Sequence, residues 1–500
     1  MKAVNLASIL DEHPSDDVAL ISRAQSTTYG ELSAQVGGLR GGLVELGIEP
    51  GDRVGIVCAN NWYFVTAYLA VLGIGAVAVP LNPLSPALEL ESELATVEAR
   101  AVIVGPSGHK WLADLDPAAV PSLEVLVASE GADFDGVVTL DDLVAHDPVP
   151  VVPRDPSDLA VLVFTSGTAG RPKAAMLSHG NLLANIDQVN ASEDRRQTAA
   201  DVSFGVLPLF HIFGLTVVLG CTLEAGGTVV LVERFDPASA LETIDRYRVT
   251  VVAGAPGMWT AWANLPDAPA DGLRTVRLAT SGSDRLPAEI STRILDCFGV
   301  TIHEGYGLTE ASPVVTSSTG QEPHFGSVGL PLTGVTIRLV DADGEDALVG
   351  DSGEIWVKGD NVFQGYWEDP DATAAVLTPD GWLRTGDVAV VDDEGYLELV
   401  DRAKDLIIVS GFNVYPAEVE DVLIEHPGVE ACAVVGVPHP YSGQAVKAYV
   451  VVAPGRSYDE DEIIAWCADH LARYKCPEKV MFVDELPHGL SGKVLRRELT

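Results

Sequence analysis

The sequence predicts an α/β protein with a large N-terminal domain of layered α/β sheets, a small β-subdomain and a small α+β C-terminal domain. Alternating helical and strand patterns fill roughly the first 400 residues, which is typical of layered sheets with mainly parallel strands. After about residue 325, shorter strands separated by Asp-Gly and Glu-Gly turns indicate a largely antiparallel subdomain. The last hundred residues form a separate mixture of helical and strand patterns.

The predicted boundaries follow these changes of pattern. The N-terminal domain is expected at 1–400 with its β-subdomain at about 325–400, a hinge at 401–405, and the C-terminal domain at 406–500. The expected N-terminal elements are a helix at 28–46, a strand at 52–57, a helix at 61–73, and strands at 76–80, 101–105, 159–164 and 249–255. The expected C-terminal elements are a helix opened by Pro416, strands at 432–437 and 446–452, a helix near 460–472 and a strand at 480–483.

Composition and charge exclude several classes of protein. The chain has 500 residues, 47% of them hydrophobic, with 31 Lys and Arg against 72 Asp and Glu, for a net charge of −41. Such an acidic surface repels nucleic acid and anionic lipid, so we expect neither as a partner. Six scattered cysteines without metal-ligand spacing indicate reduced thiols in a cytoplasmic protein. The apolar run 65–81 contains Gly73, Gly75 and Pro80, which favours a buried helix and strand over a membrane span.

A glycine- and hydroxyl-rich segment ending in a lysine follows the predicted strand at 159–164. Residues 165–173 read TSGTAGRPK. Glycines let backbone N–H groups approach phosphate oxygens, hydroxyls donate hydrogen bonds, and Lys173 supplies a positive charge. The spacing differs from that of P-loop NTPases, because Lys173 lies three residues past Gly170 and Ala174 follows it. On composition alone, an ordinary polar turn remains the alternative.

This segment resembles the phosphate loop of the adenylate-forming superfamily, which comprises acyl- and aryl-CoA synthetases, adenylation domains of nonribosomal peptide synthetases, and beetle luciferases. Six further matches occur in the expected order along the chain. They are PLFHIFG at 208–214, GYGLTE at 305–310, TGD at 385–387, DRAKD at 401–405, SGFN at 410–413 and SGK at 491–493. The resemblance therefore covers most of the chain.

The resemblance implies a site for ATP and Mg²⁺. Tyr306 corresponds to the residue that stacks on adenine, Asp387 to the ribose ligand, and Arg402 to a second nucleotide contact. The implied catalytic residues are Lys493, Thr309, Glu310 and Lys173, and the implied metal-site residues are Glu310 and Thr168. The implied ATP or AMP contacts are Thr165, Ser166, Gly167, Thr168, Gly170, Ser281, Gly282, Ser283, Glu304, Gly305, Tyr306, Gly307, Thr309, Asp387 and Arg402.

The resemblance also implies sites for the acid and for coenzyme A. Lys404 corresponds to the hinge about which a mobile C-terminal domain rotates. The implied acyl pocket consists of Phe210, His211, Gly214, Gly254, Met258, Gly282 and Gly307. The implied CoA contacts are Ser410, Gly411, Phe412, Arg473 and Lys475. Residues 281–286 read SGSDRL, which departs from the usual family pattern at Asp284 and Arg285. A local surface pair is the expected explanation, and recognition of a polar group on an unusual acid is the alternative.

The implied activity is that of an ATP-dependent acid–CoA ligase, an acyl-CoA synthetase. It would activate a small-molecule carboxylic acid, fatty or related, as an acyl-adenylate and transfer the acyl group to CoA. In the amino-acid-activating members of the superfamily, the segment that matches 210–214 presents an aspartate that pairs with the substrate ammonium. No carboxylate lies in 210–214 here, so the resemblance favours an acid without an amino group. The alternatives are an enzyme that loads a carrier-protein phosphopantetheine or keeps the adenylate as its product, and an inactive nucleotide-binding scaffold. The sequence leaves the oligomeric state open.

Overall fold

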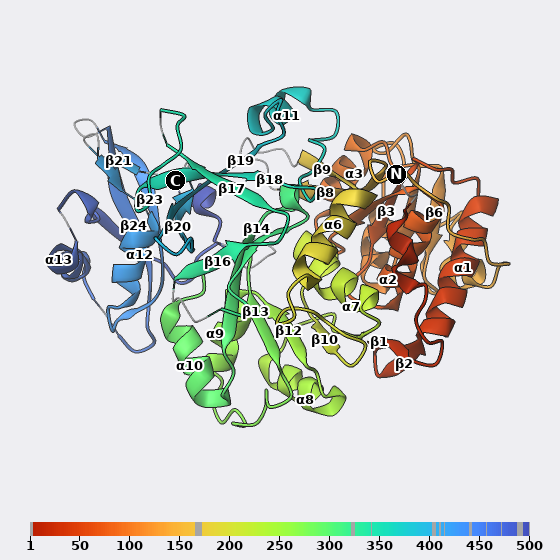
Figure 1. The fold of residues 1–500 in the computed structure, drawn as a ribbon, viewed down its shortest axis with the longest axis horizontal. Helices are drawn as coiled ribbons and strands as arrows, with labels where there is room; N and C mark the ends of the chain where they lie inside the picture. Colours follow the sequence, from red (N-terminus) through yellow and green to blue (C-terminus); the bar gives the residue numbers. More distant parts are fainter. Residues whose placement is uncertain are drawn as a thin grey trace. The chain divides into compact units, whose positions relative to one another are not determined.

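The computed structural model describes most of the chain as two compact units. The described residues are 4–165, 173–321, 326–341, 343–402, 407–409, 412–414, 416–439, 443–456, 458–471, 473–487 and 494–499. The first unit comprises Met1–Phe325, Pro331–Thr336 and Val357–Leu383. The second unit comprises Gly326–Leu330, Ile337–Trp356 and Arg384–Thr500. Figure 1 shows both units as ribbons coloured along the sequence.

One sheet of the first unit has the strand order β7-β6-β5-β3-β4-β8-β9. Every pairing in it is parallel except β8 with β9, which is antiparallel. Helices α3 and α4 pack on one face, where Leu90, Leu94 and Trp111 meet Val57 and Val102. The bounds are β3 Arg53–Val57, β4 Val77–Leu81, β5 Ala101–Val104, β6 Val125–Ala128, β7 Val138–Thr139, β8 Leu159–Thr165, β9 Lys173–Ser178, α3 Ala87–Thr96 and α4 His109–Asp114.

Helices α1 (Tyr29–Glu45) and α2 (Trp62–Gly73) belong to the same part of the first unit and appear in red in Figure 1. Helix α1 begins at a capping box, in which Thr28 and Glu31 each satisfy the other's backbone N–H. The apolar run 65–81 folds as most of α2 followed by the buried strand β4, as predicted. Among the described residues, no helix has the length and apolar character needed to cross a membrane.

The other strands of the first unit run in the order β15-β14-β13-β12-β10-β11-β1-β2. The pairings from β14 to β1 are parallel, and the two outer pairings, β14–β15 and β1–β2, are antiparallel. The bounds are β1 Val18–Ser22, β2 Gln25–Thr28, β10 Val202–Gly205, β11 Thr228–Leu231, β12 Val251–Gly254, β13 Leu278–Ser281, β14 Ile302–Gly307 and β15 Val314–Ser317. Accompanying helices are α6 His179–Asn190, α7 Cys221–Glu224, α8 Pro237–Tyr247, α9 Pro256–Ala263 and α10 Ala288–Phe298.

The second unit contains the strands of the predicted β-subdomain and the C-terminal segment. The subdomain strands run in the order β17-β18-β19-β20-β16, and β19–β20 and β16–β20 are antiparallel, as predicted. Their bounds are β16 Ser327–Pro331, β17 Thr336–Val340, β18 Ser352–Lys358, β19 Leu383–Val391 and β20 Leu397–Arg402. The C-terminal elements are β21 Ile407–Val409, β22 Phe412–Val414, α12 Pro416–Ile424, β23 Val429–His439, β24 Gly443–Val452, α13 Glu460–His470 and β25 Lys479–Phe482.

These units differ from the domains expected from the sequence. The subdomain strands form a compact unit with the C-terminal segment, whereas the sequence analysis assigned them to the N-terminal domain. Residues 403–405 of the expected hinge, with Lys404 among them, lie outside the described residues. The hinge and the domain boundaries at 400 and 406 therefore stay predictions.

Candidate active site

The antiparallel hairpin of β8 and β9 carries the two ends of the predicted phosphate loop. Thr165 ends β8, Lys173 begins β9, and the two residues are register partners. The Thr165 hydroxyl donates a hydrogen bond to the Lys173 carbonyl at 3.4 Å. The remaining predicted loop residues (Ser166, Gly167, Thr168 and Gly170) lie outside the described part of the chain.

Tyr366 links Lys173 to Glu310. The Lys173 ammonium lies over the Tyr366 ring, 5.0 Å from its centroid, and the Tyr366 hydroxyl donates a hydrogen bond to Glu310 Oε1 at 2.6 Å. Burial raises the pKa of Tyr366, and the neighbouring Glu310 carboxylate raises it further, so the phenol keeps its proton and acts as donor. A predicted phosphate ligand and a predicted metal ligand, far apart in sequence, are thus joined through one side chain.

The segment containing Tyr366 is held between β9 and Glu310. The Met176 N–H donates to the Gly365 carbonyl at 2.9 Å, and the Gln364 N–H donates to the Met176 carbonyl at 3.0 Å. The Phe363 N–H donates to the Glu310 carbonyl at 2.9 Å. Gly365 has φ +122°, a backbone conformation that residues with a side chain rarely adopt. This framework fixes Tyr366, a residue that the sequence analysis missed because no local pattern marks its contact with Glu310.

Two buried asparagines brace the turn that follows Glu310. Asn361, fully buried, donates to the Ala311 carbonyl at 2.8 Å, and the Ser312 hydroxyl donates to the Asn361 carbonyl at 2.8 Å. Asn185 of α6 exchanges two hydrogen bonds with the Val314 backbone, at 2.8 and 3.0 Å. These amides satisfy backbone groups that a tight buried turn would otherwise leave unpaired. Neither asparagine lies in one of the sequence motifs.

Strand β14 presents the predicted nucleotide residues from Glu304 to Gly307. A side chain at Gly305 would lie 2.8 Å from the Thr316 carbonyl oxygen, and one at Gly307 would lie 2.4 Å from the Pro313 carbonyl oxygen. Both glycines therefore permit close approach of the neighbouring backbone, while Tyr306 between them is 7% exposed. Glu304 Oε2 accepts a hydrogen bond from the Leu286 N–H at 3.2 Å. Burial raises the pKa of Glu304, although this bond and Arg285 oppose the change.

Of the predicted acyl-pocket residues, Gly214 lies in the first turn of a π-helix, Phe213–Gly220, and Phe210 and His211 lie just before it. Such helices are rare and often occur at functional sites. A Cβ at Gly214 would lie 2.3 Å from the Pro208 carbonyl oxygen, so only glycine fits this turn. Partly buried His211 accepts the Phe213 N–H at Nδ1 (3.3 Å), and burial lowers the pKa of its imidazole. His211 is therefore a neutral residue at pH 7.

Gly254, at the end of β12, and Gly282, just after β13, have different neighbours. Gly282 follows β13, and a Cβ there would lie 3.1 Å from the Phe213 ring. At Gly254 a Cβ would instead lie 3.0 Å from both Met258 Cε and Trp259 Nε1 of α9. Gly254 is the register partner of Ser281, the residue before Gly282. The assignment of Gly254, Met258 and Gly282 to the acyl pocket stays a prediction.

The turn after β13 contains Asp284 and Arg285, the two residues that depart from the family pattern. Ser283 has φ +73°, the left-handed conformation that glycine adopts more readily. In the next residues, the Arg285 N–H donates to Asp284 Oδ1 at 2.9 Å. The Asp284 carboxylate thus stabilises the local backbone, which gives it a structural role in the turn.

Asp387 and Arg402 lie in the second unit, on adjacent strands. They are register partners in the antiparallel pair β19–β20. Gly386 has φ +73°, and its N–H donates to Glu354 Oε1 at 3.0 Å. The Asp387 N–H donates to the Thr385 hydroxyl at 3.1 Å. The Thr-Gly-Asp segment is therefore an irregular, internally braced part of β19.

Several predicted C-terminal residues cannot be placed. Lys493, Ser410 and Gly411 lie outside the described residues, and of Phe412 only the backbone, in β22, is described. Lys475 contacts Glu418 through its ammonium group, whereas Arg473 is exposed. The assignment of these residues to CoA stays a prediction.

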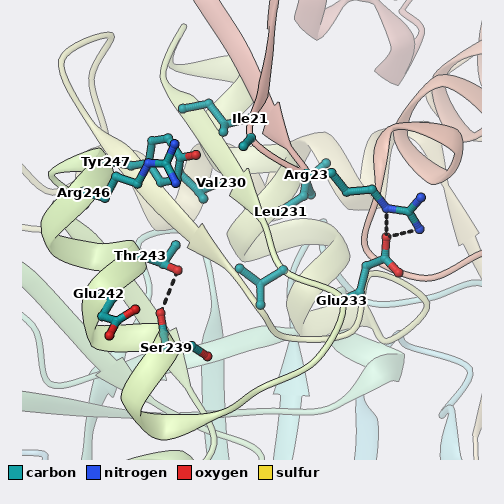
Figure 2. A pocket seen from close by; sticks show the side chains of 12 residues that line it. Ile21, Arg23, Val230, Leu231, Glu233, Ser239, Glu242, Thr243, Arg246 and Tyr247 are labelled. Carbon is teal, nitrogen blue, oxygen red and sulfur yellow. Dashed lines mark hydrogen bonds and ion pairs between the residues drawn. The ribbon is translucent and has the colours of Figure 1, made fainter.

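A separate pocket of about 440 Å³ lies beside β1, β11 and α8 (Figure 2). It contains none of the residues predicted for the site. Arg23 turns toward Glu233, with 2.8 Å between Arg23 Nη2 and Glu233 Oε1, while Arg246 lies over the Tyr247 ring. Because this pocket contains none of the motif residues, the candidate site remains the one around Glu310.

Comparison with protein families shows the class to which this fold and site belong. Residues 7–367 match the model of the AMP-binding enzyme family, and residues 418–493 match the model of the AMP-binding enzyme C-terminal domain. The chain belongs to the AMP-binding enzyme family. This confirms the resemblance on which the site residues were chosen.

Individual relatives are similar over nearly the whole chain. A feruloyl-CoA synthase of Amycolatopsis is 42% identical, covering 94% of this chain and 93% of that protein. A long-chain-fatty-acid–CoA ligase of Escherichia coli O6:H1 is 36% identical, covering 97% and 91%. The crystal structure of ATP-bound MatB from Rhodopseudomonas palustris is 35% identical, covers 100% of this chain and 98% of MatB, and has a TM-score of 0.92.

Proposed function

We propose that this chain is an ATP-dependent acid–CoA ligase that converts a fatty or related carboxylic acid into its CoA thioester through an acyl-adenylate. The observation that carries the proposal is the meeting of Lys173, Tyr366 and Glu310 next to the hairpin that bounds the phosphate loop. A cation and a carboxylate on one framework suit a nucleotide triphosphate with its divalent ion. The named CoA ligases among the relatives support the same activity.

The described residues fit a Mg²⁺ ion bound mainly by ATP. No group of three or more His, Cys, Asp and Glu side chains in the described ranges could hold a metal by itself. Glu310 Oε1 binds Tyr366, whereas Oε2 has no hydrogen-bond partner among the described residues. Mg²⁺ in nucleotide sites is commonly held by one or two carboxylates and the phosphates. We assign Glu310 to the ion with Thr168; when bound, Mg²⁺ would neutralise phosphate charge.

Adenylation in this proposal depends on positioning and charge neutralisation. The substrate carboxylate attacks the α-phosphorus of ATP, the bond to the bridging oxygen breaks, and pyrophosphate leaves. Lys173, Thr309 and Lys493 stabilise negative charge on the phosphate oxygens. The acid is already ionised at pH 7, so the step needs no general base. Tyr306 stacks on adenine, Asp387 and Arg402 bind the nucleoside, and the remaining nucleotide contacts come from Ser281, Gly282, Ser283, Glu304, Gly305 and Gly307.

The acid is proposed to lie beside Phe210, His211, Gly214, Gly254, Met258, Gly282 and Gly307, with Phe213 next to Gly282. The residues around the acid are mainly aromatic or small. The neutral His211 contributes no negative charge that could pair with a substrate ammonium. An amino acid would therefore bury an unpaired charge, at a cost of several kcal/mol. This supports an acid without an amino group.

Thioester formation is assigned to a second arrangement of the same chain. The C-terminal segment rotates about Lys404, and the CoA thiol attacks the acyl-adenylate carbonyl. The thiol loses its proton, the C–S bond forms, and AMP leaves as the C–O bond breaks. Ser410, Gly411 and Phe412 would border the pantetheine arm, with Arg473 and Lys475 as cationic contacts for CoA. Lys475 would first have to leave Glu418.

The experiment that tests this function is pyrophosphate release across a panel of acids, with and without CoA. The panel should contain short, medium and long fatty acids, ferulic and benzoic acids, and amino acids. We expect release only with acids that lack an amino group, faster turnover with CoA, and one acyl-CoA formed for each AMP. Release without CoA consumption would instead indicate transfer to a carrier protein or an adenylate as the product.

A further inference from the structure

We infer that Tyr366 is a positioning residue that orients the Glu310 carboxylate toward nucleotide-bound Mg²⁺ and keeps it from pairing with Lys173. The inference rests on the proposed function, because it concerns how the same site receives ATP. It adds a residue whose side chain neither the sequence motifs nor the family match assigned to the site.

The hydroxyl end of Tyr366 determines the orientation of Glu310. It donates a 2.6 Å hydrogen bond to Oε1. A hydrogen bond to a charged acceptor is about twice as strong as one between neutral groups. Because Oε1 is bound in this way, rotation of the carboxylate is restricted and Oε2 remains available for another ligand. A freely rotating carboxylate would lose conformational entropy each time it bound the ion.

The ring of Tyr366 contacts Lys173, and this contact supports the inference that Tyr366 keeps Glu310 from pairing with Lys173. Lys173 Nζ lies 5.0 Å from the ring centroid, within the range of a cation–π interaction. No ion pair joins Lys173 to Glu310, although both residues are described and both contact the same phenol. A direct pair would neutralise the two charges that the triphosphate and its ion require. The ring stabilises the ammonium while leaving its charge available.

The position of Tyr366 is itself determined by the surrounding backbone. Its N–H donates to the Thr373 hydroxyl at 2.9 Å, and the neighbouring Trp367 N–H donates to the Ala174 carbonyl at 2.8 Å. The side chain is 8% exposed and packs edge-on against Phe363, with 5.1 Å between the ring centroids. A residue fixed at both backbone and ring can hold its hydroxyl at one point, which is what positioning a ligand requires.

The test compares Tyr366→Phe with the matched control Tyr29→Phe. Tyr29 is also buried, and its hydroxyl donates a 2.7 Å hydrogen bond to the Gly227 carbonyl, away from Glu310. Calorimetry measures ATP binding during a Mg²⁺ titration, AMP binding in EDTA, and the melting temperature. For Tyr366→Phe we expect the half-saturating Mg²⁺ concentration to rise about tenfold, with AMP affinity unchanged. Tyr29→Phe should change only the melting temperature.

A double-mutant cycle separates positioning from general destabilisation. Adding Tyr366→Phe to Glu310→Gln should cause little further loss of Mg²⁺-dependent ATP binding if the hydroxyl acts through the carboxylate. An additive loss, an unchanged Mg²⁺ dependence in Tyr366→Phe, or equal weakening of AMP and ATP would overturn the inference. Wild-type protein that binds ATP while Tyr366→Phe behaves identically would refute only this inference. Wild-type protein that binds no ATP would refute the proposed function.

Discussion

Asp387 and Arg402 are direct partners across the antiparallel strands β19 and β20. Thirteen residues of chain, with a turn near Gly395, separate the two motifs that contain them, and the strand register brings their backbones together. Both were chosen from separate short motifs as nucleotide contacts. Their pairing gives those motifs a common place in the fold, on one subdomain of the second unit.

The first prediction concerns Asp387. Replacing Asp387 by Ala should lower ATP and AMP affinity about tenfold or more, because a carboxylate that accepts hydrogen bonds from ribose hydroxyls is lost. Calorimetry with 2′,3′-dideoxy-ATP provides the control. Wild-type protein should bind this analogue weakly, and Asp387→Ala should bind it as weakly as ATP. A variant that still prefers ATP over the analogue to the wild-type extent would exclude the ribose role.

The second prediction concerns Lys493. Lys493→Ala should nearly abolish adenylation while leaving thioester formation from a supplied acyl-adenylate largely intact, because the lysine is assigned to phosphate charge in the first half-reaction only. The two half-reactions are measured separately, by pyrophosphate–ATP exchange and by CoA consumption. Lys479→Ala, an exposed lysine of the same segment, is the control and should affect neither. Equal loss of both half-reactions in Lys493→Ala would contradict the two-arrangement account.

The third prediction concerns the contact between Phe213 and Gly282, which we propose forms one side of the acid site. Gly282→Ala places a methyl group 3.1 Å from the Phe213 ring, which should narrow the acid site and reduce kcat/KM most for bulky acids. Phe213→Ala should shift preference toward larger acids. The double variant should recover part of the loss seen in Gly282→Ala. Rates across the acid panel measure these effects, and an identical loss for every acid would show that this contact does not select the substrate.

The fourth prediction concerns pH and His179. Burial first, and the nearby Arg154 charge second, lower the pKa of His179 from 6.5 to about 4. The unfolded chain therefore binds more protons than the folded chain between these values, so stability is full above pH 6.5 and falls as pH drops toward 4. This pKa difference corresponds to a decrease of about 3 kcal/mol in the free energy of unfolding as the pH falls through this range.

Melting temperatures from pH 7 to 4 measure this dependence in wild-type protein and in His179→Gln. The glutamine oxygen can still accept the Leu6 N–H that His179 Nδ1 now accepts at 3.1 Å. We expect a shallower pH dependence in this variant, and an unchanged one in His470→Gln, which alters an exposed histidine. The account would be contradicted by parallel curves for His179→Gln and wild type.

Local patterns predicted much of the fold because their causes are local. Thr28 and Glu31 lie three residues apart and form the capping box that begins α1. The glycines and proline of the run 65–81 divide it into α2 and β4. The Asp-Gly and Glu-Gly turns indicated the antiparallel subdomain. The compact units were not predicted, because the packing of the subdomain strands depends on contacts between distant parts of the chain.

The candidate site also combines residues that local motifs identify with residues that only long-range contacts bring into place. The motifs identified Lys173 and Glu310, but the residues that fix them act across long distances in sequence. Tyr366 donates a hydrogen bond to Glu310, and Asn361 donates one to Ala311; no periodicity or spacing in the sequence predicts these contacts. The neighbours of Gly254, which are Met258 and Trp259 of α9, likewise follow from the packing of α9 on β12 and from no motif around Gly254.

The measurement that tests the central claim most directly is acid-dependent exchange of labelled pyrophosphate into ATP, performed without CoA. The account predicts exchange that requires both an acid and Mg²⁺, is lost in Glu310→Gln, and is accompanied by an acyl-adenylate detectable by mass spectrometry. Absence of exchange with every acid tested, or cleavage of ATP to ADP and phosphate in its place, would contradict it.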